Sequence, residues 1–289
     1  MFSLYNIRIV AKYEIKVLWR SWFFRIFSGI ALGFITLMSI GILARFSHAP
    51  WALKGIPSMI PYMNIKLLNV AQAIIAIFLA SDFLKRDKKA DTTEVVYMRS
   101  IDNMDYVFGK TIAVIFMFLA LNFVLLLIAF IIHFFFSDTF FNIFPYLLYP
   151  LYISLPTLMF VIGLAYILML LTRNQAVTTV LLLGYAGAVL FFLGGKVYSF
   201  FDFFAFQMPL LFSDIAGFGN LNDILLLRGF YVMTGLSLIF LTAFYLRRLP
   251  QSRWMTQLAA VCAVIGLVLS AILAHQKKKK KSSFDDIRT

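Results

Sequence analysis

The sequence predicts an all-α integral membrane protein, and three observations lead to this fold class. Of the 289 residues, 62% are hydrophobic and only 13% are charged, about half the charged share of a soluble domain. Several stretches run for about 18 residues or more with hardly a charge, which is long enough to cross the hydrocarbon of a bilayer. They are too long and continuous for the alternating strands of a membrane barrel, and a helix satisfies its own backbone hydrogen bonds in lipid.

Apolar windows of membrane-spanning length occur seven times along the chain. The last of them is followed by a Lys-rich tail, residues 275–289. The expected spans are 26–45, 65–84, 111–135, 146–171, 176–195, 228–246 and 254–274.

Lysine and arginine predict the orientation, because basic residues favour the cytoplasmic side of a membrane. They are concentrated in the N-terminal stretch and in the connections after the second, fourth and sixth spans. We therefore expect a cell membrane (inner membrane) protein with a cytoplasmic N-terminus, and the net charge of +13 does not require a nucleic-acid partner. The run from Lys277 to Lys281 departs from this pattern, since seven crossings place it outside. A terminal segment can escape the rule. Otherwise the tail leads into an external part absent from this chain, or the last segment does not cross.

The N-terminal stretch 1–25 is predicted to be an amphipathic helix in the membrane interface. Arg8, Lys12, Lys16 and Arg20 recur every four residues and therefore form one stripe on a helix. Apolar residues that include Trp19 and Trp22 cover much of the other face, which suits contact with membrane lipids at headgroup level. The alternative is an ordinary cytoplasmic helix end.

Residues 196–227 are neither a clean span nor a polar loop. Aromatic residues alternate there with Asp202, Gln207, Pro209 and Asp214. One interpretation is an external hairpin that dips into the membrane, where irregular backbone requires cover from protein or water. The other is an aromatic belt that stays at the interface.

The chain carries no pattern that indicates enzymatic chemistry of its own. Gly109, Lys110 and Thr111 match the end of a phosphate-binding loop, but Met104 stands where its first glycine should be, and a membrane span follows. The three histidines are far apart in sequence, so we expect neither a metal site nor a catalytic site. If a nucleotide drives this protein, another subunit binds it.

Polar side chains inside the spans are better functional candidates, because they are costly in lipid. Asn69 and Gln72 are three residues apart on one face of the second span, and Asn122 lies in the middle of the third. They either join helices by hydrogen bonds, as Thr157 also would, or lie along a translocation path.

The connection 85–110 concentrates charges of both signs. Its middle, "ADTTEVVYMRS", can form a short helix with Asp91 or Thr92 as the cap. The apolar edge of such a helix would rest either on the membrane or in the groove of a partner protein.

This connection resembles the cytoplasmic loop between the second and third spans of ABC-2 type transporter permeases. Such loops show Thr-x-Glu followed by apolar residues, then a basic residue, an aromatic residue and Gly-Lys at the start of the next span. The matching residues here are Thr92 or Thr93, Glu94, Val95, Arg99, Tyr106, Gly109 and Lys110. The N-terminal basic helix also occupies the place of that family's connecting helix. The resemblance implies that the six spans over residues 26–246 form the permease core, and that the seventh, 254–274, is an extra span that departs from the family's six-span plan.

The resemblance implies an exporter that works with two cytoplasmic ABC ATPase subunits, which bind ATP and Mg²⁺, and with a second permease, identical or related. The short helix would then be the coupling helix that inserts into the ATPase. The implied partner contacts are Asp91, Thr92, Glu94, Val95, Arg99, Asp105, Tyr106, Gly109 and Lys110.

Three functions remain open at this point. The first is a permease that moves an unidentified, lipid-like or amphiphilic cargo outward. The second is a membrane anchor that recruits a cytoplasmic partner through the 85–110 connection without transport. The third, a membrane-embedded enzyme acting on lipids, is the weakest because no catalytic constellation is present.

Overall fold

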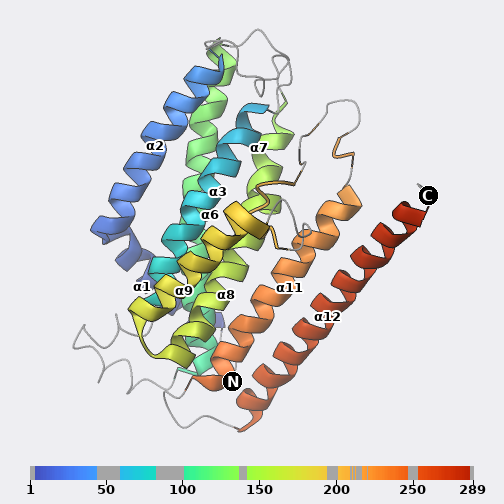
Figure 1. Ribbon diagram of the computed structural model, residues 1–289. Helices are drawn as coiled ribbons and strands as arrows, with labels where there is room; N and C mark the ends of the chain where they lie inside the picture. Colours follow the sequence, from blue (N-terminus) through green and yellow to red (C-terminus); the bar gives the residue numbers. More distant parts are fainter. Residues whose placement is uncertain are drawn as a thin grey trace.

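The computed structural model describes residues 4–43, 59–82, 101–136, 142–193, 201–208, 210, 212, 217–219, 221–246 and 253–286. Nearly all of these residues are helical, and no β-strand occurs within those ranges. Seven of the helical stretches are long and apolar enough to cross a membrane. The prediction of an all-α, multi-pass membrane protein is confirmed at this level, and Figure 1 shows the long helices side by side in one bundle.

The helices follow one another with short interruptions. The stretch from Phe144 to Thr172 combines α7, the π-helix η1 and α8 into one candidate span, and α9 continues into the π-helix η2 in the same way. The bounds are α1 Leu4–Arg20, α2 Trp22–Leu43, α3 Met59–Ser81, α6 Asn103–Phe136, α7 Phe144–Tyr149, η1 Pro150–Ser154, α8 Leu155–Thr172, α9 Gln175–Ala188, η2 Val189–Leu193, α11 Leu221–Tyr245 and α12 Arg253–Asp286.

Three helices begin six to eight residues before the expected spans, which were predicted to start at 65, 111 and 228. They start at Met59, Asn103 and Leu221. The hydropathy pattern stops at polar residues, but these residues are buried against other helices, as Asn64, Asn103 and Arg228 are. Protein contacts, rather than lipid, therefore accommodate these polar residues near the starts of α3, α6 and α11.

The end of α3, the start of α6, the turn between α8 and α9 and the end of α11 lie at one end of the bundle (Figure 1). The side chain of Asn103, at the start of α6, donates a hydrogen bond to the carbonyl of Leu246, just after α11. Ser21, Asp82 and Gln175 line one shared groove at the same end. The positive-inside rule predicts that this end is cytoplasmic, and the C-terminus lies at the other end.

The N-terminal helix α1 packs mainly against α6. Ile7, Ala11 and Leu18 are buried on its inner face, whereas the predicted basic stripe of Arg8, Lys12, Lys16 and Arg20 is exposed. The two helices approach closely at Gly109, where a Cβ atom would lie 2.6 Å from Cβ of Val10. Part of the apolar face that was expected to contact lipid therefore contacts α6 instead.

The structure changes two expected boundaries. The helix break falls at Ser21, so Trp22 belongs to α2 rather than to the amphipathic helix. The helix α6 begins at Asn103, so Asp105, Tyr106, Gly109 and Lys110 lie in its first turns and not in a loop. Asp105, Tyr106 and Lys110 are buried there, because α1 covers this end of α6. The predicted contacts Asp91, Thr92, Glu94, Val95 and Arg99 lie outside the described residues.

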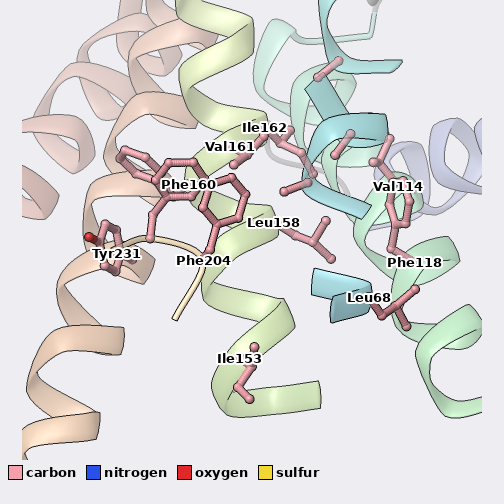
Figure 2. Packing of buried hydrophobic residues seen from close by; sticks show 14 of the residues in the cluster. Leu68, Val114, Phe118, Ile153, Leu158, Phe160, Val161, Ile162, Phe204 and Tyr231 are labelled. Atoms are coloured by element: carbon pink, nitrogen blue, oxygen red, sulfur yellow. The ribbon is translucent and has the colours of Figure 1, made fainter. Parts of the chain in front are cut away.

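The core is centred on α8, which is buried along most of its length. Figure 2 shows Phe160 of α8 beside Phe204 and Tyr231, and Leu158 pointing toward α3. The rings of Phe160 and Tyr231 meet edge to face at a centroid distance of 5.2 Å, a favourable aromatic geometry. Helix α12 lies at the edge and packs mainly on α11, where Ser237 Oγ donates to the carbonyl of Ala263 at 2.6 Å.

Helices α8 and α11 approach closely through a pair of glycines. A Cβ atom at Gly163 would lie 2.7 Å from the carbonyl oxygen of Gly235, and one at Gly235 would lie 2.6 Å from the backbone of Met159. Because these neighbours are backbone atoms, they cannot rotate away. Small residues of this kind allow membrane helices to pack backbone to backbone.

We expect Gly235→Ala to destabilise the bundle, because the added methyl group forces α8 and α11 apart, at a cost of about 1–3 kcal/mol. The control is Gly184→Ala in α9, where a Cβ atom would meet nothing within 4 Å. Thermal unfolding of the detergent-purified protein should show a lower Tm for the first variant only. Equal Tm values for the two variants would contradict the close packing of α8 and α11.

Candidate functional site

A buried arginine is the most unusual group in the bundle. Arg228 lies in the second turn of α11 and is only 2% exposed, inside a candidate membrane span. An uncompensated cation at such a position is costly, so Arg228 can be stable there only through its hydrogen bonds. Its guanidinium also lies over the ring of Tyr231, 5.5 Å from the centroid, a cation–π contact.

The guanidinium of Arg228 donates to backbone carbonyls on two sides. Nε contacts the carbonyl of Tyr152 at 2.9 Å, and Nη2 contacts that of Ile153 at 3.2 Å. On the other side, Nη1 and Nη2 contact the carbonyl of Phe203 at 3.2 and 3.3 Å. The planar fork of an arginine suits such multiple contacts better than a lysine.

The carbonyl of Tyr152 is available because of a proline. In a regular α-helix it would accept a hydrogen bond from the N–H group of residue 156, but residue 156 is proline, which has none. Pro150 opens the π-helix η1 in the same region, and π-helical turns commonly occur at functional sites. The local sequence of α7, η1 and α8 therefore creates the acceptor that Arg228 uses.

The other partner of Arg228 is a non-helical segment, residues 201–208, which we call the inserted segment. Phe203, Phe204 and Ala205 at its centre are almost fully buried. The carboxylate of Asp202 closes its turn, because it accepts from the N–H groups of Phe206 at 3.0 Å and Gln207 at 2.7 Å. This places irregular backbone inside the bundle, which membrane proteins tolerate where protein covers it.

The turn of the inserted segment adopts an unusual backbone conformation. Ala205 has a φ angle of +55°, in the left-handed region that residues other than glycine seldom occupy. Its N–H group donates to the carbonyl of Asp202 at 3.1 Å. Surrounding contacts must stabilise this conformation, since strain of this kind persists only where the neighbouring structure determines it.

Thr157 and Asn69 complete the polar cluster. The Thr157 hydroxyl lies 2.6 Å from the carbonyl of Phe203, to which it is placed to donate, and 3.2 Å from Nη2 of Arg228. Nδ2 of Asn69 donates to Thr157 Oγ1 at 3.1 Å and to the carbonyl of Phe204 at 2.7 Å. Both carbonyls of the Phe203–Phe204 pair are therefore satisfied by side chains from three helices.

Two tyrosines attach the rest of this region to the bundle. The hydroxyl of Tyr62, on α3, donates to the carbonyl of Met208 at 2.8 Å. The N–H group of Phe212 donates to the hydroxyl of Tyr149, on α7, at 3.0 Å. The chain after the turn is thus bound by hydroxyl groups of residues that are themselves buried.

The structure brings together two of the three polar residues that were predicted within the spans. Gln72 Nε2 donates to Asn69 Oδ1 at 2.8 Å, so both belong to the cluster around the inserted segment. The amide of Asn122 is buried on α6, and neither of its polar atoms has a hydrogen-bond partner among the described residues. Within residues 196–227, Phe203 and Phe204 are buried in the bundle, and the external hairpin that dips into the membrane stays a prediction.

Sequence reasoning did not assign a role to Arg228, Asp202 or Tyr62 in this cluster. A signal for Arg228 was present, because it adjoins an apolar run, and Pro150 and Pro156, which interrupt another span, indicated a break in its helical hydrogen bonds. What the sequence cannot show is that the freed carbonyl and the arginine meet, since 75 residues separate Arg228 from Ile153.

A second group of contacts lies at the base of the bundle, where α6 begins. Asn6 of α1 donates to Asp105 Oδ2 at 3.2 Å, and the ammonium group of Lys110 lies 4.9 Å from the ring centroid of Tyr106. On the other side of α6, the rings of Phe108 and Phe240 meet at a centroid distance of 4.9 Å. The first turns of α6 are thereby joined to both α1 and α11.

The cluster around Arg228 is suited to binding carbonyl oxygens and to fixing a chain segment. Within the part of the chain that the structure describes, no three His, Cys, Asp or Glu side chains are grouped as they would be around a metal ion. Comparison with known protein families finds no family model that matches the chain, and no curated protein is significantly similar to it.

We expect Thr157→Val to destabilise the protein by about 1–3 kcal/mol, because the isosteric side chain leaves the carbonyl of Phe203 with fewer donors. The matched control is Thr234→Val, whose hydroxyl only donates to Phe230 within its own helix at 2.8 Å. Thermal unfolding should separate the two variants. A Tm for Thr157→Val as high as that of the control would mean that the hydroxyl does not stabilise the inserted segment.

Replacing Arg228 should have a larger effect. Arg228→Met removes donors from three buried carbonyls, of which those of Ile153 and Phe203 share one remaining side-chain donor, the Thr157 hydroxyl. A carbonyl left unsatisfied costs about 1–3 kcal/mol, whereas Arg228→Lys should recover only part of the loss. Arg173→Met, at the exposed turn after α8, serves as the control. Limited proteolysis should cut the first variant near residues 201–208 faster than the control, and equal rates would contradict the assignment.

Proposed function

We propose that this chain is the transmembrane subunit of an ATP-driven exporter of the ABC-2 type. Two cytoplasmic ABC ATPase subunits would supply ATP hydrolysis, and a second permease, identical or related, would complete the transport unit. The resemblance of the 85–110 connection to the coupling loop of that family motivates the proposal. The supporting observation concerns α6, the helix that follows this connection. The structure joins its first turns to both α1 and α11.

That observation is the set of contacts at the base of α6. The charged segment leads directly into α6, whose first turns contact α1 through Asp105 and Gly109. The same turns contact the end of α11 through Asn103 and Phe108. A displacement of the segment by a partner would therefore act on three helices at once and not on a free loop.

Helix α11 extends this connection toward the buried cluster. Its end near Leu246 contacts the base of α6, and Arg228 lies about 27 Å away along the same helix, at 1.5 Å per residue. Because Arg228 binds the carbonyl of Phe203, a shift of α11 would also act on the inserted segment. We infer that the inserted segment moves when the cargo path opens. Coupling requires an element with two arrangements, and the inserted segment would be that element.

The cargo is inferred only as a class. The faces of α2, α6, α9 and α12 expose large apolar side chains such as Phe34, Phe116, Val180 and Val264, and the bundle interior around α8 is largely apolar. A lipid-like or other amphiphilic molecule suits such surroundings better than a highly charged one.

A membrane anchor without transport is the second candidate. One observation favours it. The guanidinium of Arg228 binds the protein's own backbone, so cargo could pass through this cluster only if these groups separated. The two candidates differ in whether a bound ATPase changes its activity with cargo. If the chain is an anchor, the rate of ATP hydrolysis by the recruited partner should not change when cargo is added.

The coupling role predicts that Glu94→Ala combined with Arg99→Ala weakens ATPase binding by about tenfold or more, because charge-assisted hydrogen bonds are lost. The measurement is co-purification with a Walker A ATPase encoded beside this protein, followed by ATP hydrolysis and transport in proteoliposomes. Lys54→Ala with Asp138→Ala, both in connections predicted to be external, is the control. A double variant that still assembles and still exports would contradict the coupling role.

A further inference from the structure

A single charged residue lies inside the second candidate membrane span. Between Ile60 and Ser81, Lys66 is the one Asp, Glu, Lys or Arg, in the half of α3 that is farther from the predicted cytoplasmic end. Its side chain is half-buried. An ionisable residue inside a span is costly and commonly belongs to a functional site, so the partners of its ammonium group indicate its role.

Two aromatic side chains contact the ammonium group of Lys66. Nζ lies 5.0 Å from the ring centroid of Tyr62, one turn earlier on α3, and 5.0 Å from that of Phe206 in the inserted segment. It also donates to the hydroxyl of Tyr62 at 3.3 Å, and this hydroxyl donates to the carbonyl of Met208. These contacts place the ammonium group where α3 meets the inserted segment.

The same contacts leave part of the ammonium group without an acceptor. An ammonium group has three N–H donors, and among the residues that the structure describes only the Tyr62 hydroxyl accepts from it. The acidic residue of the inserted segment, Asp202, is 3% exposed and accepts from two N–H groups of its own turn. The two rings attract the positive charge of Lys66, but an anion with oxygen acceptors would satisfy it more completely.

The open side of this site is suited to the boundary between lipid headgroups and acyl chains. Phe206 is 38% exposed and provides an apolar surface beside the ammonium group. Lysine side chains near the ends of membrane helices extend toward the interface, and the contact with Tyr62 directs Lys66 toward the start of α3. An occupant therefore needs an anionic group next to an apolar part.

We propose that Lys66 and Phe206 bind an anionic phospholipid, in the leaflet at this end of the bundle. A phosphate oxygen accepts from the free donors of the ammonium group, since lysine binds phosphate as a compact point charge. The glycerol end of an acyl chain packs against the ring of Phe206. The site thereby joins α3 and the inserted segment through a lipid.

Phosphatidylglycerol has the required chemistry, because its headgroup carries one negative charge and no cation. A choline headgroup would bring a second positive charge close to Lys66, and Asp202 is not available to receive it, because it is buried and already hydrogen-bonded. The site does not depend on transport, because it contains no residue of the 85–110 connection. A failure of the coupling experiment would therefore leave this proposal intact.

Native mass spectrometry of the full chain in detergent tests the proposal without a mutation. The protein is titrated with phosphatidylglycerol and with phosphatidylcholine, and inorganic phosphate is then added as a competitor. We expect phosphatidylglycerol to bind about tenfold more tightly than phosphatidylcholine, because no second cation opposes Lys66, and inorganic phosphate at equal concentration should not displace it. Equal binding of the two lipids would overturn the proposal, and displacement by inorganic phosphate would contradict a lipid as the occupant.

Substitutions then test whether Lys66 is responsible for the preference. Lys66→Gln should weaken the tightest binding of phosphatidylglycerol by about tenfold, the factor that one charge-assisted hydrogen bond supplies. Lys66→Arg should retain it, since a guanidinium also binds phosphate.

The control is Arg173→Gln, which removes a cation from the exposed turn at the other end of the bundle and should leave the tightest binding unchanged. A preference for phosphatidylglycerol that persists in Lys66→Gln would show that it arises elsewhere on the basic surface. An equal loss in Lys66→Gln and Arg173→Gln would show only general attraction between charges. Either result would overturn the proposal.

Discussion

The fold depends on a mutual compensation between a buried guanidinium and a stretch of irregular backbone. An arginine at the centre of a membrane helix costs about 2.5–3.5 kcal/mol on insertion scales, which is an upper value for Arg228 in the second turn of α11, and unpaired carbonyls in lipid cost several kcal/mol each. In this protein the donors of Arg228 and the carbonyls of Tyr152, Ile153 and Phe203 satisfy one another. Neither the arginine nor the inserted segment would be stable at this position without the other.

Other local features follow from this compensation. Pro156 leaves the carbonyl of Tyr152 without its helical donor, Asp202 closes the turn through two N–H groups, and Ala205 accepts a left-handed conformation. Asn69 and Thr157 then join α3 and α8 to the same turn. Because α11 also carries the contact with the base of α6, the segment and the predicted docking connection belong to one packed network.

Much of the architecture could be predicted from hydropathy and basic residues alone. The seven candidate spans and the exposed stripe of Arg8, Lys12, Lys16 and Arg20 are both found in the structure, because they depend on local periodicity. The burial of Asp105 and Arg228, near the starts of α6 and α11, could not be predicted, because the contacts that bury them are distant in sequence. For the same reason, Asn69 and Gln72 were recognised as candidates but their partner Phe204 was not, and the residues of segment 83–100 remain predictions.

Hydrogen exchange measured by mass spectrometry on the full chain in nanodiscs tests the central claim most directly. The N–H groups of Ala205, Phe206 and Gln207 donate to Asp202 inside the bundle, so a peptide covering 201–208 should exchange slowly, like the buried helix α8. It should become fast in a variant without the Arg228 guanidinium. Fast exchange of this peptide in the unaltered protein, at the rate of a solvated surface loop, would show that the segment is not held in the bundle and would contradict the account.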